Sequence, residues 1–527
     1  MLKKHYKETA VLYLTVVFIL AWCFIMRFID NGVMGLRSDE ATSALFVSNH
    51  SPFTRAFWQA CKSQVAGMPW SFIDYWAYLE ILKRAVPFEH MMKHMEFYLR
   101  FPVTMLSLIA AIAGFFMVKR LSGSAILASI ITVCVFTLSD VAAYSSNVIR
   151  FHGWGFSYSI ISFCLLAYLL TSQTMSKTKQ YVFLFSWAWF AIINGWSHIY
   201  SVYALIVQWF TFCIAGLGWA PRLSLPPVSK WAKRCVLTAV GFSGVMQIFF
   251  FINYMHNPVF RGAKEVASPY AFTESFNAII NTFDRLIFLP NMWLWLAAFL
   301  CFIVFAIKRE KLAEGQKWKK WLMVGVSVGQ LLVCAVFSFR MLSRNWSPES
   351  HYLLLGIVPF IFFFSYLAQY TFKSEWDKTK AVYIVSAALI GFYLFNPNVS
   401  MTFFHKTPGF NLTTRPSEWH DLRDEILALD AYGKVDYIFG AQPYWDHSVQ
   451  MDVHGRGLDH LWQAYAGGPF SIAPITSYSR NFYGGRIGLD CSQASRYSEA
   501  KMGSSSAKSY GLDFCKKDKI RIRIVEK

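Results

Sequence analysis

The sequence predicts an α-helical polytopic membrane protein with about 11 transmembrane helices and a small C-terminal extracytoplasmic α/β domain. Hydrophobic residues make up 55% of the 527 residues, and charged residues only 15%. Soluble globular proteins carry roughly 25% charged residues. Many uncharged stretches also reach about 20 residues, which is the length that spans the hydrocarbon core of a bilayer. These observations exclude a single soluble domain.

The basic character of the chain follows the predicted membrane topology. Its formal net charge is +19, which in a soluble protein would favour a nucleic-acid partner. Here the Lys and Arg residues cluster between apolar segments, as they do in the cytoplasmic loops of membrane proteins. We therefore expect a membrane environment and no nucleic acid.

The first span is predicted over about residues 10–29. Lys3, Lys4 and Lys7 precede it and indicate a cytoplasmic N-terminus. The segment begins like a signal peptide, but its apolar part is too long and no small-residue cleavage site follows, so we expect it to be retained. Residues 30–96 then lie outside.

Ten further spans follow from the hydropathy and charge pattern. Each predicted inner segment carries at least two Lys or Arg residues, whereas acids, His and Pro gather in the outer segments. An odd number of spans places the tail, residues 398–527, outside, and residues 1–397 form the transmembrane domain. The spans are expected at about residues 98–118, 123–143, 152–171, 180–196, 199–218, 235–254, 286–307, 321–339, 352–372 and 381–397.

The first outer loop contains two predicted amphipathic helices, at about residues 51–63 and 70–86. Ser51 before Pro52 is typical of a helix start. We expect both helices to lie in the membrane interface. The alternative is a pair of buried soluble helices, but the outer segment before the next span is too short to cover them. The expected apolar faces are Phe53, Phe57 and Ala60 in the first helix, and Phe72, Ile73, Trp76, Leu79 and Leu82 in the second, opposite Glu80 and Lys83.

The tail has the pattern of a small α/β domain. "PSEWHDLRDEILALDAYGKVDYIFG" predicts an amphipathic helix, a turn at Gly433 and a strand. "KIRIRIVEK" alternates apolar and charged residues, as a half-buried strand does.

The acidic pair Asp39–Glu40 stands shortly after the first span, where acidic residues are unusual. It allows three interpretations: a solvated loop, an ion or proton site, and a catalytic carboxylate that acts on a substrate at the interface. The apolar "ATSALFV" follows at once, so the pair is held close to the membrane surface. Partial desolvation there raises the basicity of a carboxylate and suits a general base.

An ordered series of motifs resembles the GT-C class of integral-membrane glycosyltransferases, in the branch of protein O-mannosyltransferases and lipid A aminoarabinose transferases. The series runs through "DEA", "GMPWSFIDYW", "FYLRFPVTMLSLIAAIAGFFMVKRLSG", "NVIRFHGWGFSYSIISFCLLAYLL", "NGWSHIYSVYALIVQW", "SPESHYLLLGIVPFIFFF" and "RPSEWHDLRDEIL". Each motif alone is weak, but together they cover about residues 1–440 in order.

The resemblance implies a GT-C-like fold and transfer of a sugar from a polyprenyl-phosphate donor to a lipid, polysaccharide or protein acceptor on the outer face. Asp39 matches the catalytic acidic residue of the class and Glu40 its neighbour. The resemblance implies neither a metal nor a cofactor. This chain departs from the class at Gly67-Met68-Pro69, where Lys-Pro-Pro or His-Pro-Pro is frequent, and at His351, where Arg is frequent.

Cations in the predicted outer turns are the candidate ligands of the donor phosphate. Arg150 could instead contact a lipid headgroup. Arg261 and Lys264 lie in the long outer loop before the eighth span, where they could instead be solvated. His198, in a tight outer turn, is equally consistent with a structural role. The complete set of candidates is Arg150, His198, Arg261, Lys264, Arg344 and His351.

The main rival interpretation is a lipid or glycan transporter or flippase without transferase activity. It predicts polar or broken segments at mid-membrane or internal repeats, whereas the polar residues here crowd the outer ends of the spans. A non-catalytic relative of the glycosyltransferases would be expected to lose Asp39. We expect residence in a bacterial inner membrane.

Overall fold

The computed structural model describes nine helices and three short strands. The described residues are 17, 21, 38–49, 51–63, 69–122, 128, 132, 148–149, 151–171, 175–198, 201–216, 229–255, 437–439, 487–490 and 522–525. The first, third and eighth to eleventh predicted spans lie outside these residues, apart from single positions. The total of eleven spans therefore stays a prediction.

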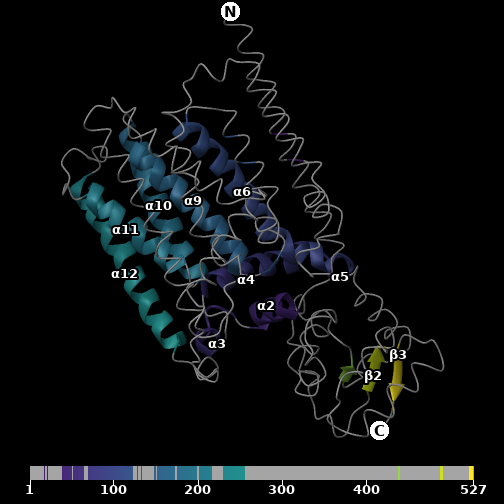
Figure 1. The fold of residues 1–527 in the computed structure, drawn as a ribbon. Helices are drawn as coiled ribbons and strands as arrows, with labels where there is room; N and C mark the ends of the chain where they lie inside the picture. Colours follow the sequence, from purple (N-terminus) through teal and green to yellow (C-terminus); the bar gives the residue numbers. More distant parts are fainter. Residues whose placement is uncertain are drawn as a thin grey trace, which may run out of the picture. The chain divides into compact units, whose positions relative to one another are not determined.

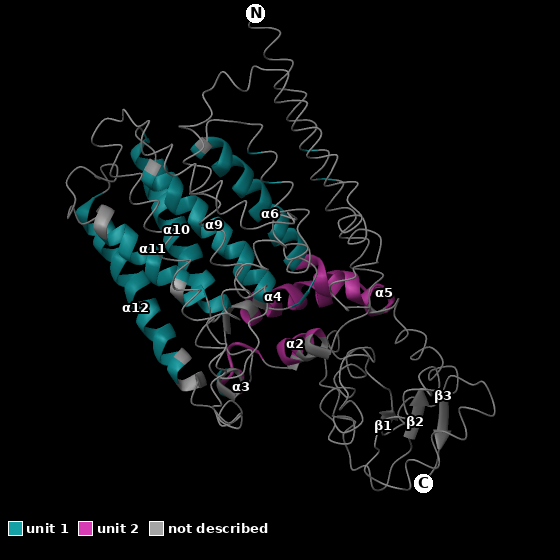
Figure 2. Ribbon diagram, in the orientation of Figure 1, with its two compact units in different colours: residues 1–28, 58–71, 103–409 teal, residues 29–57, 72–102, 410–527 magenta. Residues whose placement is uncertain are grey.

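The chain divides into two compact units, which Figure 2 colours separately. The first comprises residues 1–28, 58–71 and 103–409, and the second residues 29–57, 72–102 and 410–527. The predicted domain boundary near residue 398 lies outside the described part of the chain.

Four helices of the first unit pack side by side: α9 (Phe151–Thr171), α10 (Lys177–Ser197), α11 (Ser201–Gly216) and α12 (Lys230–Met255) (Figure 1). They lie where the fourth to seventh spans are predicted. Ser176 caps α10, because its hydroxyl accepts a hydrogen bond from the backbone N–H of Lys179. His198, in an extended conformation, ends the same helix.

Two described helical segments are long and apolar enough to cross a membrane. They are Met95–Leu121, within α6 (Met95–Ser122), and His152–Leu170, within α9. Both coincide with predicted spans. The apolar stretch of α11, Ala204–Cys213, is shorter.

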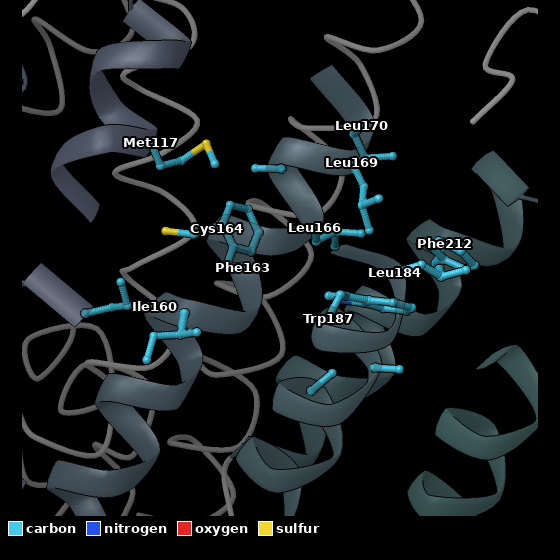
Figure 3. Close-up of a cluster of buried hydrophobic side chains, with 14 of the residues drawn as sticks. Met117, Ile160, Phe163, Cys164, Leu166, Leu169, Leu170, Leu184, Trp187 and Phe212 are labelled. Atoms are coloured by element: carbon cyan, nitrogen blue, oxygen red, sulfur yellow. The ribbon is translucent and has the colours of Figure 1, made fainter. Parts of the chain in front are cut away.

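The core of the first unit is built around Trp187 of α10. Its indole ring is fully buried and stacks on Phe212 of α11, with the ring centroids 4.5 Å apart; Figure 3 shows both side chains. The indole N–H donates to Gln208 Oε1 over 3.1 Å, and Gln208 Nε2 donates to Ser162 Oγ over 3.3 Å. An apolar interior makes an unpartnered polar group costly, so this chain of hydrogen bonds allows the three helices to bury polar side chains.

The second unit contains α2 (Ser38–Asn49), α5 (Phe88–Lys93), most of α4 (Pro69–Ala85), and the beginnings of α3 (Arg55–Ser63) and α6. The Phe46 side chain of α2 contacts both α3 and α4. Its ring lies 5.7 Å from that of Phe57 and 4.8 Å from that of Phe72, and all three rings are buried.

The helix predicted from residue 51 begins four residues later. Residues 51–54 form a turn in which the Thr54 N–H donates to the Ser51 carbonyl over 3.0 Å. The Thr54 hydroxyl then accepts from the N–H of Phe57 over 3.3 Å, which makes Thr54 the N-cap of α3. Phe53 consequently lies outside the helix and is 85% exposed, so the prediction that it shares an apolar face with Phe57 is wrong.

The buried face of α4 is formed by Phe72, Tyr75, Leu79 and Leu82. This i, i+3, i+7, i+10 spacing defines one stripe of a helix. The predicted members Ile73 and Trp76 lie at its margin, where they are only partly buried. The prediction omitted Tyr75, although it is 1% exposed.

Three short strands are described in the tail: β1 (Tyr437–Phe439), β2 (Ile487–Asp490) and β3 (Ile522–Val525) (Figure 1). β2 is central, pairing in parallel with β1 and antiparallel with β3. β1 and β3 lie in the two segments that the sequence predicts as strands. The helix predicted before Gly433 lies outside the described residues.

Candidate active site

The acidic pair forms the second and third residues of α2, which begins at Ser38. A helix N-terminus carries partial positive charge, so carboxylates in the first turn are stabilised by about 0.3–1 kcal/mol. This explains locally why an acidic pair is compatible with the start of a helix that continues with buried Ala44, Phe46 and Val47.

The Glu40 carboxylate forms a buried, two-pronged ion pair with Arg100 of α6. Arg100 donates from Nε to Oε1 over 3.0 Å and from a terminal guanidinium nitrogen to Oε2 over 2.7 Å. The Glu40 side chain is 0% exposed and that of Arg100 4%. Two parallel charge-assisted bonds fix orientation as well as distance. The ion pair therefore holds the first turn of α2 against the first turns of α6.

Arg100 was not among the residues that the sequence singled out. One feature could have identified it: no charged residue occurs between Arg100 and Lys119, so it is an isolated cation at the entrance to an apolar span. Ionisable residues in that position are costly and usually have a partner. Its partner, however, is 60 residues away in the chain, and the sequence alone does not identify it.

Tyr75 places a buried phenol in the field of this ion pair. Burial raises its pKa well above the ordinary value, with smaller contributions from Tyr78 and then Glu40, while Arg100 lowers it. The hydroxyl is therefore protonated at neutral pH and is a hydrogen-bond donor. Among the described residues it has no hydrogen-bond partner.

The neighbouring Tyr78 differs from Tyr75 in this respect. Its hydroxyl donates to the Tyr98 carbonyl over 2.7 Å, and its ring stacks between Tyr75 and Phe101, with centroids 6.2 and 6.4 Å away. Tyr78 thus has a structural hydrogen bond that fixes α4 against α6. The Tyr75 hydroxyl has no such bond to any described residue.

His198 belongs to a second buried cluster, in the first unit. His152 Nδ1 and His198 Nε2 are 3.1 Å apart, so one of these nitrogens carries the proton and the other accepts it. The rings approach closely because residue 155 is glycine: a Cβ there would lie 2.7 Å from His198 Cβ. This contact occupies one nitrogen of each ring and fits the structural role that the sequence left open for His198.

The other predicted phosphate ligands lie outside the described residues: Arg150, Arg261, Lys264, Arg344 and His351. The side chain of Asp39 is also outside them, although its backbone belongs to α2. Their roles stay predictions. Within the described part of the chain, no group of three or more His, Cys, Asp and Glu side chains could hold a metal ion.

No protein-family model and no curated protein matches the sequence. Two solved structures have a similar chain trace. The first, apo ArnT from Cupriavidus metallidurans, has 11% identity and a TM-score of 0.48, and the alignment covers 92% of this chain and 94% of that one. The second, the Archaeoglobus fulgidus oligosaccharyltransferase, has 11% identity and a TM-score of 0.41, covering 94% and 70%. At these values neither structure transfers a residue role or a substrate to this chain.

Proposed function

We propose that this chain is a membrane glycosyltransferase that moves a sugar from a polyprenyl-phosphate carrier to an acceptor on the outer face, with Asp39 as the general base. The observation that supports this most is the buried Glu40–Arg100 ion pair. In this proposal the two adjacent carboxylates have different tasks. Because Glu40 is paired with Arg100, we assign proton transfer to Asp39.

The proposed reaction is a direct displacement at the anomeric carbon. An acceptor hydroxyl oxygen attacks this carbon, the bond from the carbon to the carrier phosphate breaks, and the configuration inverts. Asp39 takes the proton of the hydroxyl, and the phosphate leaves on the carrier with the bonding electron pair. A positioned base of this kind contributes about 10²–10⁴-fold to the rate.

Glu40 and Arg100 act as positioning residues in this proposal. Their two hydrogen bonds, of 3.0 and 2.7 Å, restrain the first turn of α2 and with it the backbone of Asp39. The Tyr75 hydroxyl, which has no hydrogen-bond partner among the described residues, supplies a neutral donor close to Glu40 in this proposal. Charge on the leaving phosphate also requires cations, for which we propose Arg150, Arg261, Lys264, Arg344 and His351, with His198 in a supporting role.

The proposed acceptor is a lipid, a polysaccharide or a protein in a bacterial cell envelope. Deletion of the gene, followed by mass spectrometry of the envelope glycans, would identify the sugar and the acceptor together. Loss of one glycosylated species is the expected result, and an unchanged set of glycans contradicts the proposal.

Purified full-length protein in nanodiscs gives the direct test. Short prenyl phosphates (ten carbons) that carry glucose, mannose or an amino sugar are supplied with an envelope extract as acceptor, and release of free prenyl phosphate is measured. Asp39→Asn should lower the rate about 10²–10⁴-fold because it keeps the shape and removes the base.

Glu89→Gln is the matched control, since Glu89 is an exposed carboxylate in the first turn of α5. It should retain the wild-type rate. An Asp39→Asn rate within a few-fold of wild type would reject Asp39 as the base.

A further inference from the structure

Three buried polar side chains near one end of α10, α11 and α12 lack hydrogen-bond partners among the described residues. They are Asn194, with both amide atoms unpaired, Ser201, with its hydroxyl unpaired, and Gln247, with Oε1 unpaired. All three are 0% exposed. None has been given a part in the proposed reaction.

Contacts between the helices bring these residues to the same region. Gln247 of α12 lies against Gly195, where an added Cβ would be 2.7 Å from Gln247 Nε2. Trp196 Nε1 and Gln247 Nε2 each donate to Ser243 Oγ over 2.9 Å, which ties α12 to the last turn of α10. Gln247 is therefore adjacent to the helical turn that contains Asn194.

Ser201 reaches the same region from the start of α11. Its N–H donates to the carbonyl of His198, the residue that ends α10, over 2.9 Å. Its hydroxyl would be 3.3 Å from a Cβ at Gly155 of α9. The hydrogen bond to His198 places Ser201 beside the C-terminal end of α10, and His198 follows Asn194 by four residues, which is about one helical turn.

The helical register places Asn194 toward α9 and α11. It lies seven residues after Trp187, which contacts Phe212 and Gln208 of α11. It also lies four residues after Phe190, whose ring is 6.0 Å from that of Tyr158 of α9. Residues at these spacings share one helix face, so the amide projects into the helix bundle, in keeping with its complete burial.

Such an arrangement is costly without an occupant. A buried amide with no partner is strongly destabilising, because its hydrogen bonds to water are lost and not replaced. The Asn194 amide, the Ser201 hydroxyl and the Gln247 carbonyl oxygen, all buried at one end of these helices, are better explained by a polar ligand that enters the bundle. We propose that Asn194, Ser201 and Gln247 form a binding site for the hydroxyl groups of a neutral saccharide.

The chemistry of the three groups matches hydroxyls better than phosphate. An amide both donates and accepts, as does a serine hydroxyl, and Gln247 contributes an acceptor. Sugar hydroxyls also donate and accept, so one saccharide can pair with all of them. The described residues of α9 and α11 include no Lys, Arg, Asp or Glu, and those of α10 include charges only in its first turn. A phosphate would therefore meet no Lys or Arg side chain from the described residues at this end of the three helices.

The choice of a saccharide among polyhydroxyl compounds rests on the proposed function. Two sources supply the same chemistry: the sugar of a lipid-linked donor, and a sugar of the acceptor. The probes are therefore a prenyl phosphate that carries glucose, mannose or an amino sugar, the same prenyl phosphate without a sugar, and the free methyl glycosides. Their binding to the full chain in nanodiscs is measured by thermal shift.

Asn194→Leu is the main variant, because it is similar in size and removes only the amide. Without ligand its melting temperature should equal or exceed that of wild type, since no hydrogen bond is lost. Its affinity for saccharide-bearing probes should fall about tenfold or more. Ser201→Ala is a smaller second change with the same expected direction.

Gln180→Leu is the control, since it removes a buried amide at the opposite end of α10. It should lower the melting temperature, because Gln180 Nε2 donates to the Met175 carbonyl over 2.8 Å, and it should leave saccharide affinity unchanged.

The outcomes separate this inference from the proposed function. A sugar-dependent shift that Asn194→Leu abolishes supports the site, and its appearance with the prenyl-linked or the free glycosides identifies the source. If the bare prenyl phosphate binds but no sugar adds to the shift, the site is rejected and the lipid-linked donor is retained. If free glycosides bind through Asn194 but no prenyl phosphate binds, the site is retained and the donor is rejected. An Asn194→Leu protein that is several degrees less stable without ligand would show a structural amide and reject the site.

Discussion

Neutralising one partner of the Glu40–Arg100 ion pair should destabilise the protein substantially. Both side chains are buried, at 0% and 4% exposure, and are joined by hydrogen bonds of 2.7 and 3.0 Å. Two unit charges about 4 Å apart attract by about 4 kcal/mol at an effective dielectric constant of 20. Mutation of one partner of buried pairs costs about 3–5 kcal/mol, because the other charge is left without compensation. We therefore expect Glu40→Gln and Arg100→Met each to cost about 3–5 kcal/mol.

This free energy converts to a modest shift in melting temperature. Unfolding entropy is about 2.1 cal/mol/K per residue, or about 1.1 kcal/mol/K for a chain of 527 residues. A loss of 3–5 kcal/mol thus lowers the melting temperature by about 3–5 °C. The double variant Glu40→Gln/Arg100→Met leaves no isolated charge and should regain more than half of this loss.

Fluorescence-detected thermal unfolding of the detergent-purified chain measures these shifts. Glu80→Gln is the matched control, because Glu80 also pairs with a cation, Lys83, over 3.3 Å but is one-third exposed. A pair of this kind contributes at most about 1 kcal/mol, so the control should shift by about 1 °C or less. If the single variants at the buried pair behave like the control, or the double variant is the least stable, the reasoning is refuted.

Four further predictions concern Tyr75, Gly155 and the membrane topology that the sequence predicts. Tyr75→Phe should leave the stability at neutral pH unchanged or slightly higher, since the hydroxyl has no partner among the described residues. The same change should slow sugar transfer at least several-fold. A transfer rate equal to that of wild type contradicts a role for Tyr75 in the active site. Burial raises the pKa of Tyr75, so above the unfolded pKa of about 10 the unfolded chain releases the phenol proton while the folded chain keeps it. Wild type should therefore lose more stability than Tyr75→Phe as the pH rises from about 10 to 11. Gly155→Ala should cost about 1–3 kcal/mol in thermal unfolding, because the new Cβ meets His198, and an unchanged melting temperature would argue against the close His152–His198 packing. Alkaline phosphatase fused after Lys527 should be active and green fluorescent protein dark, and the opposite result would place the tail in the cytoplasm.

The sequence predicted the elements that depend on local pattern. It predicted α6 and α9 because each contains an uncharged stretch long enough to span a membrane, with basic residues on either side. β3 follows from the alternation in "KIRIRIVEK". The acidic pair at Asp39 and Glu40 was also singled out from local context, because carboxylates are unusual beside an apolar segment. These properties are encoded within about 20 neighbouring residues, so they are accessible without a structure.

What only the tertiary structure decided is which side chains meet. The partner of Glu40 is 60 residues away on another helix, and the partner of His198 is 46 residues away. Tyr75 was overlooked because its burial depends on the elements that pack over α4, not on its own polarity. The helix start predicted at Ser51 lies four residues too early, because the Thr54 hydroxyl accepts from the N–H of Phe57 and α3 begins at Arg55. Hydropathy and periodicity specify how a segment folds, whereas ion pairs, ring contacts and unpaired buried groups arise where segments distant in sequence pack together.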